Sequence, residues 1–320
     1  MLKLTWLRIF ALTLSCVTLH QARAQTVEPV HIVVASPAGS GLDQRVRDFT
    51  PHLQSVLGRQ VVVDNRTGQS SLDIAAMVAK ALPDGNTFYV GASGFVLPPK
   101  ENGSKVTFDP LKELAPVSLV VVLQTVAFAS TSTNANSVQE LVALANAPKS
   151  DLKVLTEGAG THSHLAAAWF ARDVKAQFHY LHLDALQAHK AIVEPGDRVM
   201  FGSLPLSLED LAAKRIKALA ISGTKRHPLF PDLPTFAESG FADFAPMAWF
   251  GIFAPGGTPP SITDGLAAAI GDAAKEPQFV EKMYRYGSQA ASNSPLEFAR
   301  FIESERAKWQ GVARAAAFAN

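Results

Sequence analysis

The stretch "VVASPAGSGLDQRVRDF", residues 33–49, passes from β-branched residues through two glycines directly into an amphipathic pattern. Hydrophobic residues recur at Leu42, Val46 and Phe49, a spacing that predicts a helix starting just after the glycines. Free N–H groups at such a helix start favour negative charge, and glycine lets the backbone approach a ligand closely. The stretch therefore indicates an anion-binding loop, with a tight strand-to-helix turn as the alternative.

Short β-branched runs and helical patterns alternate along the rest of the chain, which is typical of an α/β fold with crossover helices. We expect strands at 30–35, 61–64, 87–91, 118–123, 126–130, 152–156, 178–181, 199–201, 218–222 and 249–254. We expect helices at 42–57, 73–81, 137–146, 164–174, 208–214, 262–274 and 295–316, with Pro51 inside the first. No flexible linker is present, so we expect the chain to cross between two domains on strands near 122–127 and 244–249.

The first 24 residues have the features of a secretory signal peptide. Lys3 and Arg8 precede and enter an apolar stretch over 7–19, and Ala22-Arg23-Ala24 places small residues at the two positions that define cleavage. We expect cleavage after Ala24 and export to the periplasm. The single cysteine, Cys16, lies in this leader, so we expect a mature chain without disulfides or cysteine metal sites.

Composition excludes several classes of protein. The chain has 320 residues, 48% of them hydrophobic, enough for a large core divided between two domains. Loss of Lys3, Arg8 and Arg23 with the leader would change the formal net charge from +1 to about −2. With no basic stripe, nucleic-acid binding is not expected, and no later segment is long and apolar enough to span a membrane.

The common cofactor motifs are missing: no complete dinucleotide fingerprint, P-loop, G-x-S-x-G elbow or H-E-x-x-H helix occurs. Instead, five polar, glycine-bearing segments follow predicted strands. In an open α/β sheet such loops gather where ligands usually bind, so we expect them to converge on one cleft. They span 36–43, 65–71, 92–95, 157–164 and 202–207.

The chain resembles the Bug-type (TctC-like) periplasmic substrate-binding proteins of tripartite tricarboxylate transporters. The resemblance covers essentially the whole mature chain. It is carried by "PVHIVVASPAGSGLD", "LGRQVVVDNRTGQSSLDIAAMVAKALPDGNTFYVGASG", "FDPLKELAPVSLV", "GAGTHSHLAAAWF", "RIKALAISGTKRHPLFPDLPTFAESG" and "WFGIFAPGGTP".

The resemblance implies a two-lobed, Venus-flytrap fold in which each lobe is a mainly parallel sheet with flanking helices. Residues 25–125 and 247–320 would form one lobe and 126–246 the other. It further implies a binding protein rather than an enzyme. This protein would need no cofactor and would carry a small organic acid to membrane permease subunits. We expect it to act as a monomer.

The resemblance also suggests where the ligand lies. The first loop and the 157–163 loop would flank a bound carboxylate from opposite lobes, with Ser93 close by. The candidate ligand-binding residues are Ser36, Ala38, Gly39, Ser40, Asp43, Ser93, Glu157, Gly158, Gly160, Thr161, His162 and His182. From the residues alone, Asp43 is equally explained as a helix N-terminal charge.

Departures from the family pattern bear on specificity. Glu157 precedes the first glycine of the second-lobe loop, His162 replaces a serine, and Leu181-His182-Leu183-Asp184 lacks the usual lysine. If Glu157 faces the cleft, we expect a ligand with an amino, amide or other donor group opposite it. The alternative is that Glu157 faces solvent or pairs with His162 or His164.

Three rival functions use the same residues. A small-ester or amide hydrolase would need Ser93 or Ser163 beside an oriented histidine. A sensing protein would present the same closed clamp to a signalling partner. A metal-binding clamp would use the histidines that cluster between residues 162 and 189, although none has a partner at a helical zinc spacing.

Overall fold

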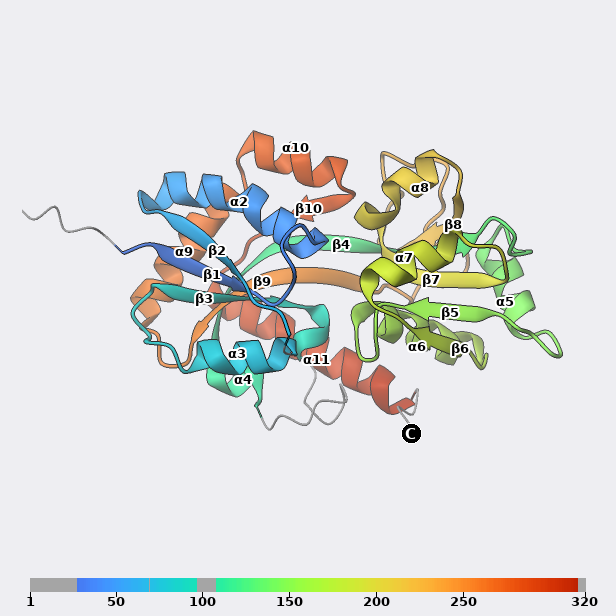
Figure 1. Ribbon diagram of the computed structural model, residues 1–320, viewed down its shortest axis with the longest axis horizontal. Coiled ribbons are helices and arrows are strands. Elements are labelled where there is room, and N and C mark those ends of the chain that lie inside the picture. Colours follow the sequence, from blue (N-terminus) through green and yellow to red (C-terminus); the bar gives the residue numbers. More distant parts are fainter. Residues whose placement is uncertain (1–27, 69, 97–107, 316–320) are drawn as a thin grey trace, which may run out of the picture.

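The computed structural model describes residues 28–68, 70–96 and 108–315, which fold into two lobes lying side by side (Figure 1). The expected signal peptide, residues 1–24, lies outside the described residues. Each lobe is a β-sheet with helices on both faces, so the α/β class and the two-lobed fold are confirmed.

The sheet of the first lobe has the order β2-β1-β3-β9-β4, with β10 also paired to β4. Its strands are β1 (Val30–Val34), β2 (Val61–Asn65), β3 (Thr87–Ala92), β9 (Met247–Pro255), β10 (Ser288–Ala290) and the first part of β4 (Leu114–Ser130). The strands β2, β1 and β3 run parallel, whereas β9 and β4 join them in antiparallel pairs. The sheet is therefore mixed, because β9, which returns from the other lobe, runs against the parallel set and against β4.

The sheet of the second lobe repeats this plan. Its strands are the second part of β4, β5 (Lys153–Thr156), β6 (His179–His182), β7 (Arg198–Ser203) and β8 (Ile216–Ile221). The strands β6, β5 and β7 run parallel, and β4 pairs antiparallel with β7 and β8.

Helices cover both faces of each sheet. In the first lobe, one face is covered by α2 (Gly41–Leu57), α9 (Pro260–Ala273) and α10 (Pro277–Arg285). The other face is covered by α3 (Ser71–Ala79), with η1 (Ser93–Val96), α4 (Pro110–Glu113) and the first half of α11 (Pro295–Ala315). In the second lobe, α5 (Val138–Ala145) and α6 (His162–Val174) lie opposite α7 (Ala185–Val193), η2 (Leu204–Ser207) and α8 (Leu208–Ala212).

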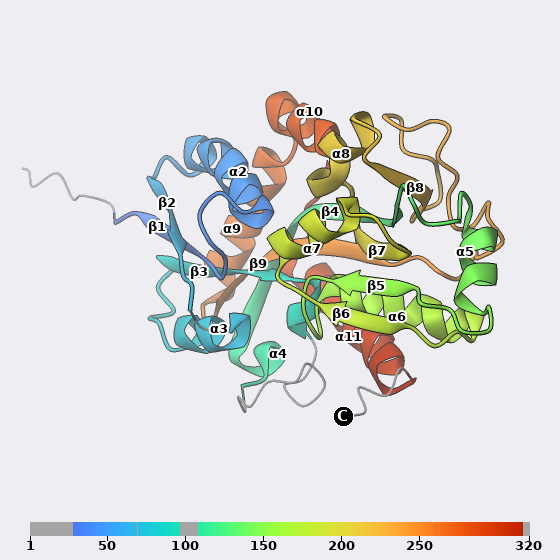
Figure 2. The same cartoon turned by 45° about the vertical axis from the view of Figure 1, so that its right-hand side comes forward.

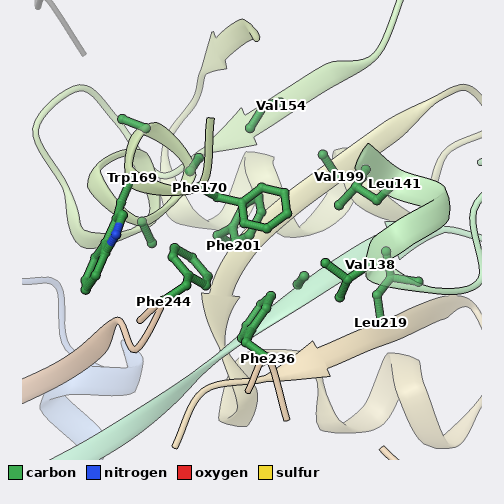
Figure 3. Packing of buried hydrophobic residues seen from close by; sticks show 14 of the residues in the cluster. Val138, Leu141, Val154, Trp169, Phe170, Val199, Phe201, Leu219, Phe236 and Phe244 are labelled. Carbon is green, nitrogen blue, oxygen red and sulfur yellow. The ribbon is translucent and has the colours of Figure 1, made fainter. Parts of the chain in front are cut away.

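Aromatic side chains fill the core of the second lobe between its sheet and α6 (Figure 3). The rings of Phe236 and Phe244 lie 4.7 Å apart in a T-shaped pair, and Phe170 lies 5.2 Å from Phe244. Such edge-to-face pairs add to the stabilisation from burying the rings. This core fixes the position of α6, whose N-terminus lies at the cavity between the lobes.

The lobes are joined by three segments. Strand β4 pairs with β9 as far as Gln124 and with β7 from Thr125 onward. Phe244 belongs to the core of the second lobe, whereas Ala248, four residues later, belongs to that of the first. The third segment is α11, which Figures 1 and 2 show passing from one lobe to beneath the other.

The end of α11 departs from the expected assignment of 247–320 to the first lobe alone. Phe298 and Ile302 pack in the first lobe, but Trp309 and Val312 pack in the core of the second. The reason is the continuous apolar face of a 21-residue helix, which is long enough to reach both cores.

All the expected strands are present, although 118–123 and 126–130 form the single strand β4. The helices α4, α7 and α10 and the strand β10 were not predicted. The helix α2 continues through Pro51 to Leu57. Among the described residues, no helix combines the length and apolar character needed to cross a membrane.

Candidate functional site

A cavity of about 500 Å³ lies between the two lobes, within the usual size range of small-molecule sites. All five polar loops expected to converge contribute residues to it. Its polar side chains come from both lobes: Ser70, Ser71 and Ser93 from the first, and Glu157, Thr161, His162, Ser163 and Ser203 from the second. Its apolar wall includes Leu42, Val90, Phe95, Leu123, Ala248 and Phe250.

The first glycine loop, residues 36–43, is held by hydrogen bonds between its own residues. The N–H of Gly39 donates to the carboxylate of Asp43 at 2.7 Å, and Ser40 caps α2 by accepting from the N–H of Asp43 at 3.3 Å. Gly39 adopts a φ of +81°, a left-handed conformation that favours glycine. The amide of Gly39, expected to hold a ligand, is therefore paired with the protein's own Asp43 carboxylate in this structure.

Asp43 is a buried structural carboxylate. Its side chain also accepts from the Asn65 amide at 2.9 Å and from Arg47 Nε at 2.9 Å. Burial alone would raise the pKa of Asp43, but these hydrogen bonds and the Arg47 charge outweigh it, and the net pKa is lowered. The residue thus fixes the loop to α2 and β2.

The loop of the second lobe leads into α6 at the cavity wall. The hydroxyl of Thr161 donates to the carbonyl oxygen of Gly158 at 2.7 Å, so α6 begins without a side-chain cap. No acidic residue occupies its first turn. The positive end of the α6 dipole is therefore left open to the cleft, beside the hydroxyls of Thr161 and Ser163.

The amide of Gly160, like that of Gly39, already has a partner within the protein. Its N–H donates to Nδ1 of His164 at 3.1 Å. This amide, expected to bind a ligand, is thus paired within the protein in this structure. The contact holds the loop against α6.

The first lobe places a second helix start at the cavity. Ser70 caps α3 in a capping box with Asp73, and Ser70, Ser71 and Leu72 line the cavity. Ser93, the first residue of η1 directly after β3, is buried and also lines the cavity. Two helix N-termini from opposite lobes therefore lie at one cavity, that of α3 already capped by the Asp73 carboxylate and that of α6 without an acidic residue.

Burial disfavours the charged form of three histidines near the cavity, His162, His164 and His182. Burial, with the Lys308 charge nearby, lowers the pKa of His162 to about 3, and His162 Nε2 lies 2.7 Å from Thr125 Oγ1. Burial and His182 lower the pKa of His164 to about 4. Burial likewise lowers the pKa of His182, whose Nδ1 lies 2.6 Å from Thr156 Oγ1 behind the cavity wall.

Glu157 is the single charged side chain among the described residues that line the cavity. Its Oε1 atom lies 3.1 Å from Nε2 of His189, which lies on α7. The alternative that Glu157 pairs with His162 or His164 is wrong in its partner, because His189 reaches the carboxylate instead.

The hydroxyl of Ser163 is hydrogen-bonded within its own loop. Ser163 Oγ accepts from the N–H of Glu157 and contacts Thr161 Oγ1, and in the described part of the chain no histidine hydrogen-bonds Ser163 or Ser93. Within the same residues, no three His, Cys, Asp or Glu side chains are placed to share a metal ion.

Five of the twelve candidate residues line the cavity: Ser93, Glu157, Gly160, Thr161 and His162. The other seven are not part of its lining: Ser36, Ala38, Gly39, Ser40, Asp43, Gly158 and His182. Ser70, Ser71, Gly202 and Ser203 line it but were not named individually, although the loops that contain them were. The sequence pattern that points to these four residues is the one used for the other loops, a polar turn that follows a strand.

The chain matches the family model described as the tripartite tricarboxylate transporter family receptor, TctC, over residues 46–317. It is similar to MatC from Rhodopseudomonas palustris with bound malate, at 26% identity and a TM-score of 0.79, covering 90% of this chain and 99% of that one. It is similar to R. palustris Rpa4515 with adipate, at 26% identity and a TM-score of 0.82, covering 91% and 98%. The periplasmic binding protein BugD is also similar, at 26% identity, a TM-score of 0.78 and coverage of 91% and 98%.

Proposed function

The chain belongs to the tripartite tricarboxylate transporter receptor family, and we propose that it captures a small organic carboxylate between its lobes and delivers it to a membrane permease. The observation that carries this proposal is the cavity between the lobes, to which five loops from both lobes contribute. The malate and adipate bound to similar proteins are organic acids of the size that such a cavity accommodates. The family consists of periplasmic binding proteins, and we propose the same compartment for this chain after removal of residues 1–24.

The carboxylate of the ligand lies at the start of α6, within reach of Thr161 and Ser163, with Ser70, Ser71 and Ser93 on the facing wall. Uncapped N–H groups and hydroxyls suit a carboxylate, because each hydrogen bond to a charged acceptor contributes about 1.5–3 kcal/mol. The apolar wall holds the carbon skeleton of the ligand. No step of this scheme alters the ligand, and the protein acts as a carrier.

The moving units are residues 25–125 with the first part of 247–320, and residues 126–246. The bending points are the junctions at Gln124 and Thr125 and between Phe244 and Ala248, where the chain passes from one core to the other. A ligand that touches both walls binds the closed form better and shifts the population towards it. The permease recognises this closed form of a monomer.

The ligand carries an amino or amide group in addition to its carboxylate. The support for this is Glu157, an acidic side chain in the wall of a cavity otherwise suited to an anion.

A substitution that fills the cavity tests the carrier role. Ala159 is exposed and lines the cavity, so Ala159→Trp blocks it without disturbing a core. Ala143→Trp, at an exposed position on α5 outside the lining, is the matched control. The proteins are exported to the periplasm of a host, purified, and denatured for mass spectrometry of the molecules released. We expect a small organic acid from the natural protein and from Ala143→Trp, and none from Ala159→Trp; the same acid from all three proteins would contradict the site.

A further inference from the structure

Glu157 places an acidic side chain in the cavity wall, and His189 is hydrogen-bonded to it. Glu157 follows β5 at the cavity wall, and His189 projects from α7 behind it. The side chains are largely buried, with exposed fractions of 23% for Glu157 and 11% for His189. Among the described residues, Oε2 of Glu157 has no hydrogen-bond partner, which leaves that oxygen for a ligand.

The hydrogen bond defines the proton on His189. An ionised carboxylate can only accept, so Nε2 of His189 carries the hydrogen and donates it to Oε1. Nδ1 of His189 is buried and has no partner in the described part of the chain. Nε2 is therefore the atom through which His189 holds the Glu157 side chain in place.

The carboxylate of Glu157 has no cationic side chain beside it among the described residues of the cavity wall. Neither lysine nor arginine is among the described residues that line it, and His162, which does, is neutral because burial lowers its pKa to about 3. A second carboxylate of a ligand placed near Glu157 would be repelled, whereas an ammonium or amide N–H would be attracted. The apolar residues Leu42, Leu123 and Phe250 form another part of the cavity lining.

We propose that this protein selects acids with one carboxylate, an apolar body and a terminal N–H donor over dicarboxylates, and that His189 is the positioning residue that orients Glu157. The inference rests on the proposed carrier function and names its ligand class. It separates this chain from similar proteins seen with malate and adipate, which carry two carboxylates each.

Three probes that differ at one end test the selection: adipate, its half-amide adipamate, and 6-aminohexanoate. All have six carbons and one carboxylate in common. Isothermal titration at neutral pH should give dissociation constants for adipamate and 6-aminohexanoate about tenfold or more below that for adipate. Glu157→Gln should weaken binding of 6-aminohexanoate, strengthen that of adipate and so remove the preference.

Two further variants separate recognition from general damage. Glu209→Gln, at an exposed acid of the same lobe outside the cavity, should leave the preference unchanged. His189→Gln keeps an N–H donor towards Glu157 and should keep the preference, whereas His189→Leu should reduce it by about threefold or more. A loss of folding alone would weaken all three probes together and leave their ratio unchanged.

The outcomes are distinct. Equal binding of adipate and adipamate, with no effect of Glu157→Gln on their ratio, would overturn the inference and leave the carrier function standing. If none of the probes binds, the acid released from the purified protein decides: an acid with an N–H donor supports the inference, and one without overturns it. Binding of no acid at all would overturn both proposals.

Discussion

Gly94 and Gly160 lie against each other across the cleft. A methyl group on Gly94 would stand 3.1 Å from the carbonyl oxygen of Gly160, closer than side chains normally approach a backbone atom. Gly94 follows β3 in the first lobe, and Gly160 precedes α6 in the second. The lobes therefore touch at the cavity wall, and the absence of a side chain at Gly94 permits this contact.

Gly94→Ala should weaken ligand binding by hindering closure. We expect an approximately fivefold or larger increase in the dissociation constant of the natural ligand, because overpacking a close contact costs about 1–3 kcal/mol. Fluorescence titration of the purified protein measures it. Gly265→Ala on α9, where an added methyl meets nothing within 4 Å, is the control and should bind normally. Unchanged affinity in Gly94→Ala would show that the two loops separate in the ligand-bound form.

Asp43→Asn should destabilise the fold without acting on the ligand directly. The substitution removes the charge that accepts from Gly39, Asn65 and Arg47, and we expect a loss of about 1–3 kcal/mol in the free energy of unfolding at neutral pH. Urea denaturation measures this loss. Asp151→Asn, at a largely exposed carboxylate, should change stability little.

The effect of Asp43→Asn should depend on pH with a defined sign. Because the folded pKa of Asp43 lies below the ordinary 3.8, its stabilisation is complete above that value and is lost as the pH falls through the folded pKa. The difference between natural protein and variant should thus shrink from about pH 5 downwards. A difference that grows on acidification would contradict the assignment of Asp43 as an ionised structural group.

His162 should make the protein sensitive to acid. Its pKa falls from 6.5 when unfolded to about 3 when folded, so the unfolded state binds a proton first and stability declines as the pH drops below 6.5. The slope from this residue is at most about 1.4 kcal/mol per pH unit. His162→Gln should flatten the decline of melting temperature between pH 6.5 and 4.5, whereas His179→Gln, at an exposed position, should follow the natural protein.

Trp309→Ala should destabilise the protein strongly although it lies near the end of α11. The indole is fully buried, donates to Glu305 at 3.0 Å and stands 5.5 Å from the His162 ring. We expect a loss of about 3–5 kcal/mol in the free energy of unfolding by urea. Leu296→Ala, at an exposed position of the same helix, should cost less than about 0.5 kcal/mol. A small effect of Trp309→Ala would mean that the end of α11 detaches without consequence.

Local sequence patterns predicted the framework of the fold well. The β-branched runs identified every strand except the three-residue β10, which is too short to show alternation. The loops that follow the strands predicted the location of the cavity, because the ends of parallel strands lie along the same edge of a sheet. The helix over 185–193 was missed, and with it the position of His189.

The site could not be completed from sequence because its decisive contacts depend on how individual side chains are placed. Gly39 and Gly160 have the sequence signature of ligand-binding amides, yet Asp43 and His164 occupy their N–H groups through contacts four residues along the chain. Glu157 and His189 are 32 residues apart and meet only because α7 packs beside β5. Spacing alone does not distinguish a free donor from one that the protein has already paired.

The central claim is that the two lobes close on one small organic carboxylate. Native mass spectrometry of the protein purified from the periplasm, followed by identification of the released molecule, tests it most directly. The account predicts one organic acid per chain, lost in Ala159→Trp and retained in Ala143→Trp. A bound molecule that carries no carboxylate would contradict it.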